Sequence, residues 1–182
     1  MTKVINFFGG PGVGKSTSAS GVFYTMKKMD ISCEYVSEYA KDCVWEETDK
    51  LLENQIHVFS EQLRRQYRLI NKVDFIITDS PLILSGIYYR FYTNKMPHPF
   101  FSEDHTKLAI EFFDRTFLQF DNINFIVKRK KKYNPVGRKQ TEDEAIQIDN
   151  MVVAKLQAAG LKFYQIDYDK AVQEVLLHLN AA

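Results

Sequence analysis

The sequence has few cysteines, almost no net charge and no long apolar run, and each of these features excludes a class of protein. Cys33 and Cys43 belong to no CxxC or Cys/His pattern, which favours free thiols in a reducing cytoplasm over a disulfide or metal site. A formal net charge of +1 gives no general attraction to nucleic acid or membranes. No apolar stretch approaches the ~20 residues needed to span a bilayer, and the N-terminus has no secretory signal pattern. We therefore expect a cytoplasmic protein without a membrane partner.

The length and the order of apolar segments predict one α/β domain over residues 1–182. Nearly continuous apolar runs are typical of parallel strands that are covered on both faces. Such runs occupy residues 4–8, 33–37, 73–78, 123–127 and 161–166. The run at 33–37 is weaker than the others, and the run at 161–166 alternates between apolar and polar residues. Segments of helical period separate them. The alternation predicts a doubly wound parallel sheet with helices on both faces.

Helix signals stand between the predicted strands. Apolar residues at spacings of three and four predict one long amphipathic helix, with a stripe formed by Leu52, Ile56, Phe59, Leu63, Tyr67 and Ile70. Ser80 and Pro81 predict a helix that begins with an N-cap and a first-position proline. Thr141 and Glu144 form a capping box that opens a helix, and Gly160 closes it.

The strongest motif is the phosphate-binding loop after the first predicted strand. Residues 9–16 match GxxxxGK[ST], which is rare by chance in a chain of this length. Its glycines let backbone N–H groups face phosphate oxygens at the N-terminus of the following helix. Lys15 can reach the β- and γ-phosphates, and the Ser16 hydroxyl suits Mg²⁺. The motif predicts that ATP and Mg²⁺ bind here, at Gly10, Pro11, Gly12, Val13, Gly14, Lys15, Ser16 and Thr17.

Two acidic residues, Asp79 and Glu38, follow predicted strands, so we expect them at the ligand-binding edge of the sheet. Asp79 is predicted to serve the metal, together with Ser16, or to act on the acceptor hydroxyl; an N-cap role is the alternative. Glu38 can orient the acceptor hydroxyl and take its proton, or it can be a first-turn helix acid. Either carboxylate can be the base.

A basic segment follows the fourth predicted strand and begins with five consecutive cations, residues 128–132. Arg129 and Arg138 flank a Tyr-Asn-Pro-Val-Gly turn, a pattern typical of a lid whose arginines stabilise charge during phosphoryl transfer. We expect this lid at about residues 129–140. A solvated surface or a nucleic-acid contact are the alternatives.

Other polar and aromatic residues are candidates for the acceptor site. Gln62 and Arg65 flank the apolar stripe of the long helix and can read a base or a phosphate, or they can be an ordinary polar flank. Tyr89 belongs to an aromatic group that lines the acceptor pocket, packs in the core or forms a homodimer contact. The other members are Tyr88, Phe91, Tyr92, Phe100 and Phe101.

The segment Asn71-Lys72-Val73-Asp74 matches the guanine-reading NKxD motif of GTPases. That motif has to follow a strand to reach the nucleotide, whereas this segment precedes one. The sequence also has no DxxG switch motif. We therefore expect no GTPase.

Taken together, the P-loop, residues 36–42 (VSEYAKD), residues 78–82 (TDSPL) and the Arg129–Arg138 segment resemble the P-loop nucleoside/nucleotide kinases. The chain is most similar to the ribosylnicotinamide-kinase-like group and its phage-encoded AAA-type ATPase/kinase relatives, over essentially its whole length, including the His98–Phe100 turn. The resemblance implies a P-loop NTPase fold with a five-stranded parallel sheet in the order 2-3-1-4-5. It also implies ATP·Mg²⁺ as donor, and an acceptor between Glu38 and the lid.

The resemblance leaves the acceptor open. Ribosylnicotinamide kinases of this group carry Asp-Thr-Asp where this chain has Asp79-Ser80-Pro81, and the Asp-Arg-Ser of deoxynucleoside kinases is absent. We expect an ATP-dependent kinase of a nucleoside or nucleoside monophosphate. The alternatives are a kinase of a hydroxymethylated base in phage DNA, a kinase of another small metabolite, and an ATP-binding or ATPase module that is not a kinase.

Overall fold

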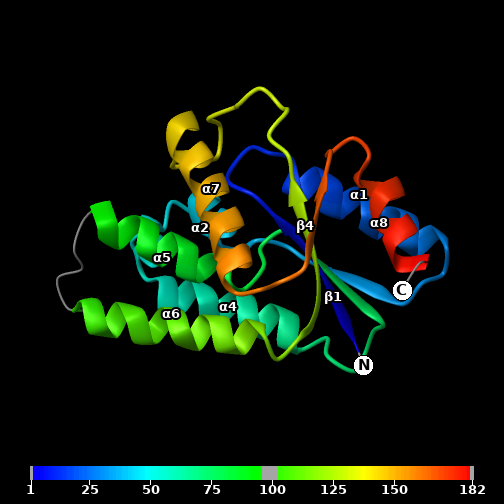
Figure 1. Cartoon of the computed structure of the whole chain (residues 1–182), viewed down its shortest axis with the longest axis horizontal. Coiled ribbons are helices and arrows are strands. Elements are labelled where there is room, and N and C mark those ends of the chain that lie inside the picture. The colour runs from blue at the N-terminus through cyan, green and yellow to red at the C-terminus, as the bar shows by residue number, and fades with distance from the viewer. Residues whose placement is uncertain (1, 96–101, 181–182) are drawn as a thin grey trace.

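The computed structural model describes residues 2–95 and 102–180, built around one five-stranded sheet (Figure 1). All neighbouring strands are parallel, in the order β2-β3-β1-β4-β5. The strands are β1 (Lys3–Phe8), β2 (Cys33–Val36), β3 (Phe75–Thr78), β4 (Asp121–Val127) and β5 (Phe163–Ile166). The predicted strand order is confirmed. The predicted His98–Phe100 turn and Phe101 lie outside the described residues.

Helices cover both faces of the sheet (Figure 1). One face carries α1 (Lys15–Lys28) and α8 (Ala171–Asn180). The other carries α4 (Gln55–Tyr67), α5 (Leu84–Lys95), α6 (Glu103–Phe117) and α7 (Glu142–Ala158). Two short helices, α2 (Tyr39–Trp45) and α3 (Asp49–Glu53), connect β2 to α4.

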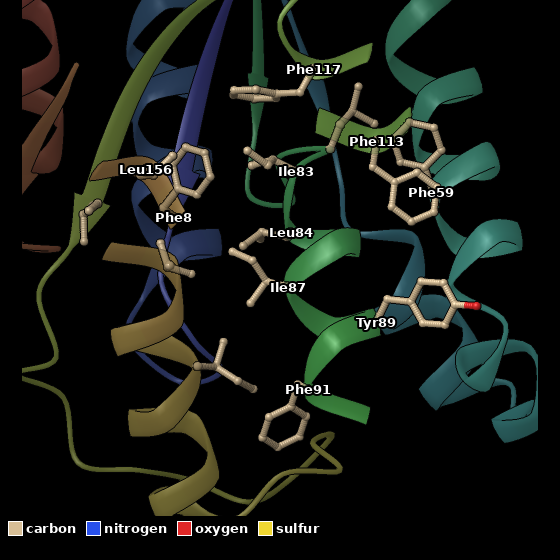
Figure 2. Close-up of a cluster of buried hydrophobic side chains, with 14 residues drawn as sticks. Phe8, Phe59, Ile83, Leu84, Ile87, Tyr89, Phe91, Phe113, Phe117 and Leu156 are labelled. Carbon is tan, nitrogen blue, oxygen red and sulfur yellow. The ribbon is translucent and has the colours of Figure 1, made fainter. Parts of the chain in front are cut away.

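The central strand β1 shows why the strands have continuous apolar sequences. Ile5 and Phe7 pack beneath α1 and α8, while Phe8 points to the opposite face, in a cluster with Phe59 and Phe117 (Figure 2). Successive side chains of a strand point to opposite faces. Because both faces are covered, nearly every position of β1 has to be apolar.

Parallel strands bring their carboxyl ends to one edge of the sheet. The P-loop follows β1, Glu38 follows β2, Asp79 follows β3 and Arg129 follows β4, so all four share that edge. The segment of residues 71–74 precedes β3 and lies at the opposite end, as predicted from the sequence.

The predicted long helix is wrong in two respects. It breaks at Asn54, whose side chain accepts a hydrogen bond from the His57 amide and so caps α4. Its apolar stripe is also only partly buried, because Phe59 lies in the core while Ile56 and Tyr67 are 42% and 69% exposed. The buried side chains are Gln55, Val58, Phe59, Gln62 and Gln66. Hydrogen bonds made by Gln55 and Gln62 make it favourable to bury these polar groups.

The helix predicted at Pro81 begins three residues later, at Leu84. The amides of Leu84 and Ser85 donate to the carbonyls of Pro81 and Leu82. These i to i−3 bonds form a tight turn that places Leu82 and Ile83 in the core. The capping box of Thr141 and Glu144 is present as predicted at the start of α7.

Candidate active site at the carboxyl edge of the sheet

A cleft of about 550 Å³ opens at the carboxyl edge of the sheet. The P-loop contributes Pro11, Gly12, Gly14, Lys15, Ser16 and Thr17 to its wall. The region of α2 to α5 contributes Glu38, Lys41, Val44, Trp45, Leu52, Gln55, Val58, Tyr88 and Tyr92. The predicted lid segment, residues 129–140, borders the same cleft. A phosphate-binding loop and a mixed apolar and polar pocket therefore share one cavity.

Lys15 is the buried cation of the P-loop, only 8% exposed, and its Nζ donates to the Gly10 carbonyl at 3.1 Å. Burial lowers the pKa of Lys15, while the nearby carboxylates of Glu38, Asp79 and Asp149 oppose that shift. Because these charges act on Lys15 together, the two acids predicted from the sequence share its surroundings. Val13, also predicted at the nucleotide site, has its side chain in the core under α1.

Helix α7 packs directly on the P-loop, through a residue that the sequence analysis missed. Asp149 accepts a hydrogen bond from the Gly10 amide at 2.5 Å and one from Arg129 Nε at 2.6 Å. A Cβ atom at Gly10 would lie 2.3 Å from the Ala145 carbonyl oxygen, so only glycine permits this approach. The sequence held one indication of this role: Asp149 is a charged residue beside the apolar stripe of the helix, which contains Ala145, Ile148 and Val152.

Arg129 connects the lid segment to the P-loop. Besides its ion pair with Asp149, it donates from Nη2 to the Pro11 carbonyl at 3.0 Å. Its Nη1 is buried without a hydrogen-bond partner among the described residues and lies against Gly12. Arg129 therefore retains an unused donor beside the phosphate-binding loop.

Arg138 lies differently from Arg129. Its guanidinium donates to the Asn134 and Val136 carbonyls of its own loop and stands over the Tyr133 ring. Arg138 borders the cleft. Its positive charge offsets part of the rise in the pKa of Glu38, although the two side chains form no ion pair. The structure thus brings Arg129, but not Arg138, into contact with the P-loop.

The basic run is partly neutralised. Lys130 and Lys128 both pair with Asp167, at 2.6 and 3.7 Å. Lys131 stands over the Tyr168 ring and reaches the Thr17 hydroxyl at 3.4 Å. Within the described residues, the run therefore shares one carboxylate, that of Asp167, between two of its lysines.

Glu38 is half-buried and lines the cleft at the N-cap position of α2. Burial raises the pKa of Glu38, and nearby Asp79 raises it further, while the cations Lys15 and Lys41 lower it. The raised pKa keeps this carboxylate ready to accept a proton, as a general base requires.

Asp79 is only 2% exposed, and it does not itself line the cleft. Its Oδ1 has no hydrogen-bond partner among the described residues. An unused carboxylate oxygen and the Ser16 hydroxyl are the oxygen donors that Mg²⁺ prefers. No group of three or more His, Cys, Asp or Glu residues within the described ranges could hold a metal alone. These donors fit a metal that is also held by phosphate oxygens and water.

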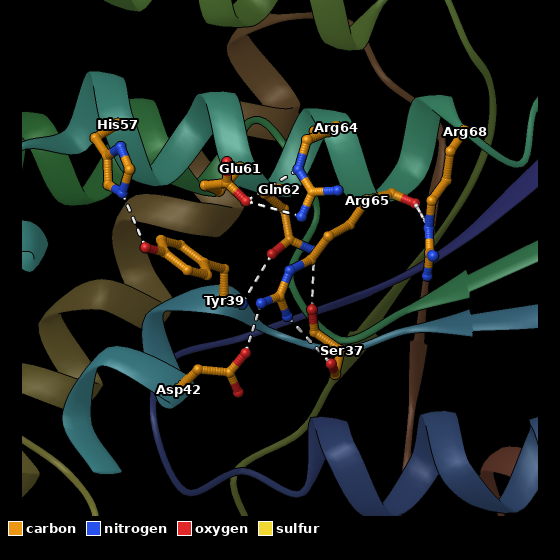
Figure 3. Close-up of polar contacts among 9 residues, drawn as sticks. All are labelled: Ser37, Tyr39, Asp42, His57, Glu61, Gln62, Arg64, Arg65 and Arg68. Carbon is orange, nitrogen blue, oxygen red and sulfur yellow. Dashed lines mark hydrogen bonds and ion pairs between the residues drawn. The ribbon is translucent and has the colours of Figure 1, made fainter. Parts of the chain in front are cut away.

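Gln62 and Arg65 do not line the cleft. Gln62 accepts from the Tyr39 amide at 2.9 Å and donates to the Ser37 carbonyl at 3.2 Å (Figure 3). Arg65 pairs with Asp42 at 2.6 Å and reaches Ser37 Oγ at 3.5 Å. Both side chains hold the chain on either side of Glu38.

The predicted aromatic group divides between the core and the cleft. Tyr89 is 3% exposed and packs in the apolar cluster with Phe59 and Phe91 (Figure 2). Tyr88 and Tyr92 line the cleft, their rings stacked at 6.3 Å. Tyr92 accepts a hydrogen bond from Gln140 of the lid segment at 2.7 Å. Helix periodicity alone could not assign these faces, because both sides of α5 are aromatic.

A family model of the AAA_28 family, described as an AAA domain, matches residues 4–174. No curated protein sequence matches the chain. Two solved structures of deoxyadenosine kinase from M. mycoides are similar, each at 17% sequence identity. The one with bound dCTP has a TM-score of 0.60 over 98% of this chain and 100% of that chain. The one with bound dATP has a TM-score of 0.63 over 97% and 99%. Over the described ranges, no helix has the length and apolar character needed to cross a membrane.

Proposed function

We propose that this chain, which belongs to the AAA_28 family of AAA domains, is an ATP-dependent kinase whose acceptor is a nucleoside or a nucleoside monophosphate. The observation that carries this proposal is a single cleft that joins a P-loop to a half-buried carboxylate with a raised pKa, Glu38. A P-loop alone binds nucleotide, and an ATPase also needs a group that orients the attacking water. The kinase is favoured because the cleft continues beyond Glu38 into a pocket that can hold an acceptor hydroxyl within reach of this carboxylate.

The donor phosphates would lie on the P-loop amides and Lys15, at the N-terminus of α1. Arg129 would add its free Nη1 donor, since Asp149 and Pro11 already fix the rest of the guanidinium. Ser16 and Asp79 would hold Mg²⁺, which neutralises charge on the phosphates when bound. Each group acts by position and charge, as phosphoryl transfer requires.

Transfer forms a bond between the acceptor oxygen and the γ-phosphorus and breaks the bond from that phosphorus to the β,γ-bridging oxygen, which leaves on ADP. With a nucleoside as acceptor, the hydroxyl proton passes to a Glu38 carboxylate oxygen, whereas a nucleoside monophosphate would attack through a phosphate oxygen that is already ionised. The raised pKa of Glu38 favours receipt of the hydroxyl proton as charge develops. Glu38 is preferred as base over Asp79 because Glu38 lines the cleft.

The pocket beyond Glu38 suits a planar, polar-edged acceptor. Trp45, Tyr88 and Tyr92 supply aromatic surface, and Gln55 supplies an amide. The Gln55 Nε2 donates to the Leu52 carbonyl at 2.6 Å, so the orientation of this amide is fixed. The two similar structures are both of deoxyadenosine kinase, which supports a nucleoside as the acceptor.

The direct test is ADP release from Mg·ATP against nucleosides, nucleoside monophosphates, nicotinamide riboside and hydroxymethylpyrimidine DNA. We expect at least one nucleoside or nucleoside monophosphate to raise the rate well above that of ATP alone. Stimulation by DNA only would replace this proposal with the DNA-base kinase. A basal rate with every acceptor would favour an ATP-binding module.

A further inference from the structure

In the turn from β2 to α2, which we call the β2–α2 corner, the side chain of Glu38 does not cap the helix. Glu38 occupies the N-cap position of α2, where a side chain ordinarily accepts from an exposed helix amide. Within the described chain, Glu38 makes no such capping bond. The first amide of α2, that of Tyr39, donates to Gln62 Oε1 of α4. Gln62 therefore satisfies one of the amides that have no partner within the helix, and the Glu38 side chain lines the cleft.

Gln62 makes a second hydrogen bond, and we call its two bonds, to Tyr39 and Ser37, the bracket around Glu38. Its Nε2 donates to the Ser37 carbonyl, so one amide group ties down the residues on both sides of Glu38 (Figure 3). Gln62 is 2% exposed, so water does not compete for these bonds. An amide has both a donor and an acceptor, and both are used here.

Neighbouring residues of α4 hold the same corner. Arg65 pairs with Asp42 in α2, and its guanidinium stands 4.9 Å from the Tyr39 ring centroid. The Tyr39 hydroxyl lies 2.8 Å from His57 Nε2. Through Gln55 and Val58, α4 also lines the cleft. One helix therefore carries both the wall of the acceptor pocket and the support of Glu38.

We propose that Gln62 is a positioning residue that fixes the Glu38 carboxylate at the acceptor end of the cleft, by tying Ser37 and Tyr39 to α4. The role in turnover rests on the proposed kinase function. The bracket itself can be tested without any acceptor.

Gln62→Met is the test variant because it keeps side-chain length and removes both hydrogen bonds. Gln66→Met is the matched control. Gln66 is equally buried, one turn further along α4, and its Oε1 has no partner among the described residues. Both variants replace a buried amide, and only one of them releases the Glu38 corner.

With the acceptor found by the ADP-release screen, we expect Gln62→Met to lower kcat by about 10- to 100-fold, because small misplacement of a reacting group is costly. We expect the KM for ATP to stay within about twofold, since the P-loop is untouched. Gln66→Met should leave kcat within about twofold.

The pH dependence of kcat distinguishes a positioning role of Gln62 from a purely structural one. Loss of the bracket exposes Glu38 to water, which lowers its pKa toward the ordinary value, so the acid limb of kcat should move to lower pH. The titratable groups that interact electrostatically with Glu38 are Lys15, Lys41, Asp79, Arg138, Tyr35, Tyr88 and Tyr92. None of them is changed by the substitution. An equal fall in kcat for both variants with an unmoved acid limb would overturn the proposal.

Amide hydrogen exchange tests the bracket independently of the proposed kinase function. We expect the Tyr39 amide to exchange about tenfold faster or more in Gln62→Met than in the wild type, with Gln66→Met unchanged. Equal Tyr39 exchange in wild type and Gln62→Met overturns the bracket even if the protein is a kinase. A wild type that no acceptor stimulates overturns the kinase proposal, and the exchange result still decides whether Gln62 holds the corner.

Discussion

At the P-loop end of the cleft, α7 holds a backbone loop with a charged residue, Asp149, whereas at the Glu38 end α4 holds one with a neutral amide, Gln62. Gln62 makes two hydrogen bonds to the chain beside Glu38, whereas Asp149 makes one to the P-loop backbone, at Gly10. The second bond of Asp149 is its ion pair with Arg129, so it fixes charge where phosphates would bind. Gln62 adds no charge beside Glu38. The comparison suggests that the donor end is organised for charge and the acceptor end for the position of one carboxylate.

Lys15→Ala tests the donor end most severely. The change removes the one lysine of the P-loop, and we expect kcat/KM for ATP-dependent transfer to fall by about 1,000-fold or more. The fold should persist, because a buried ammonium is lost and not an apolar contact. Transfer measured by ADP release, with circular dichroism as the control for folding, checks this. Near-normal turnover would refute the P-loop assignment.

Glu38→Gln tests the acceptor end. We expect transfer to fall by about 100-fold or more, while ATP affinity stays within about threefold. In the wild type the raised pKa means that the base form is lost at a higher pH than for an ordinary carboxyl, so the rate should decline early on acidification. If Glu38→Gln changes neither transfer nor the acid limb, Glu38 is only a helix-terminal acid.

The same variant should be more stable at pH 7. A carboxyl whose pKa is raised in the folded state stabilises the fold most when protonated, and that contribution is lost as pH rises through the folded pKa. At pH 7 the ionised group therefore opposes folding. We expect Glu38→Gln to raise the midpoint of thermal unfolding at pH 7 and to lose that advantage at low pH.

Asp149→Asn sharpens the difference between the two supports. The amide oxygen still accepts from the Gly10 N–H, but the charge opposite Arg129 is lost. We expect the KM for ATP to rise about tenfold and the free energy of unfolding to fall by about 1–3 kcal/mol. Asp167→Asn is the control, because its lysine partners are exposed and such pairs contribute about 0–1 kcal/mol. Equal effects of the two changes would contradict a special role for Asp149.

Gly137→Ala gives the smallest expected effect and reports on the lid segment. Gly137 has φ +70°, and an added Cβ would lie 3.0 Å from the Trp45 ring. We expect a cost of about 1 kcal/mol and a change in the fluorescence of Trp45, the single tryptophan. Gly160→Ala is the control, since Gly160 has φ +63° with no atom within 4 Å of the added Cβ. It should show similar strain and unchanged fluorescence.

The donor end could be predicted from sequence because its requirement is local. A backbone that faces phosphates needs glycine at fixed spacing, and Lys15 and Ser16 follow within the same eight residues. The strand order was implied by the resemblance to P-loop kinases, and the placement of Glu38 and Asp79 at one edge followed from parallel topology. The residues predicted to bind nucleotide and acceptor remain predictions in their roles.

The acceptor end could not be read in the same way, because its contacts cross between distant segments. Gln62 and Arg65 were singled out as residues that read the acceptor, yet their partners lie in α2 and its preceding loop. The apolar stripe of residues 52–70 also indicated the buried face only in part, since α4 buries Gln55 and Gln62, whose hydrogen-bond partners are brought to them by folding. Tyr89 and Tyr88 are adjacent in sequence, and packing alone sends one to the core and the other to the cleft.

The close approach of α7 to Gly10 has a thermodynamic consequence. The lid segment leads directly into α7, and Asp149 and the Ala145 carbonyl contact the Gly10 backbone. If a ligand that binds residues 129–140 shifts α7, it will also change the affinity of the P-loop for nucleotide. By reciprocity, the nucleotide would then change the affinity of residues 129–140 for their ligand by the same factor. The order in which the two ligands bind would leave this coupling free energy unchanged.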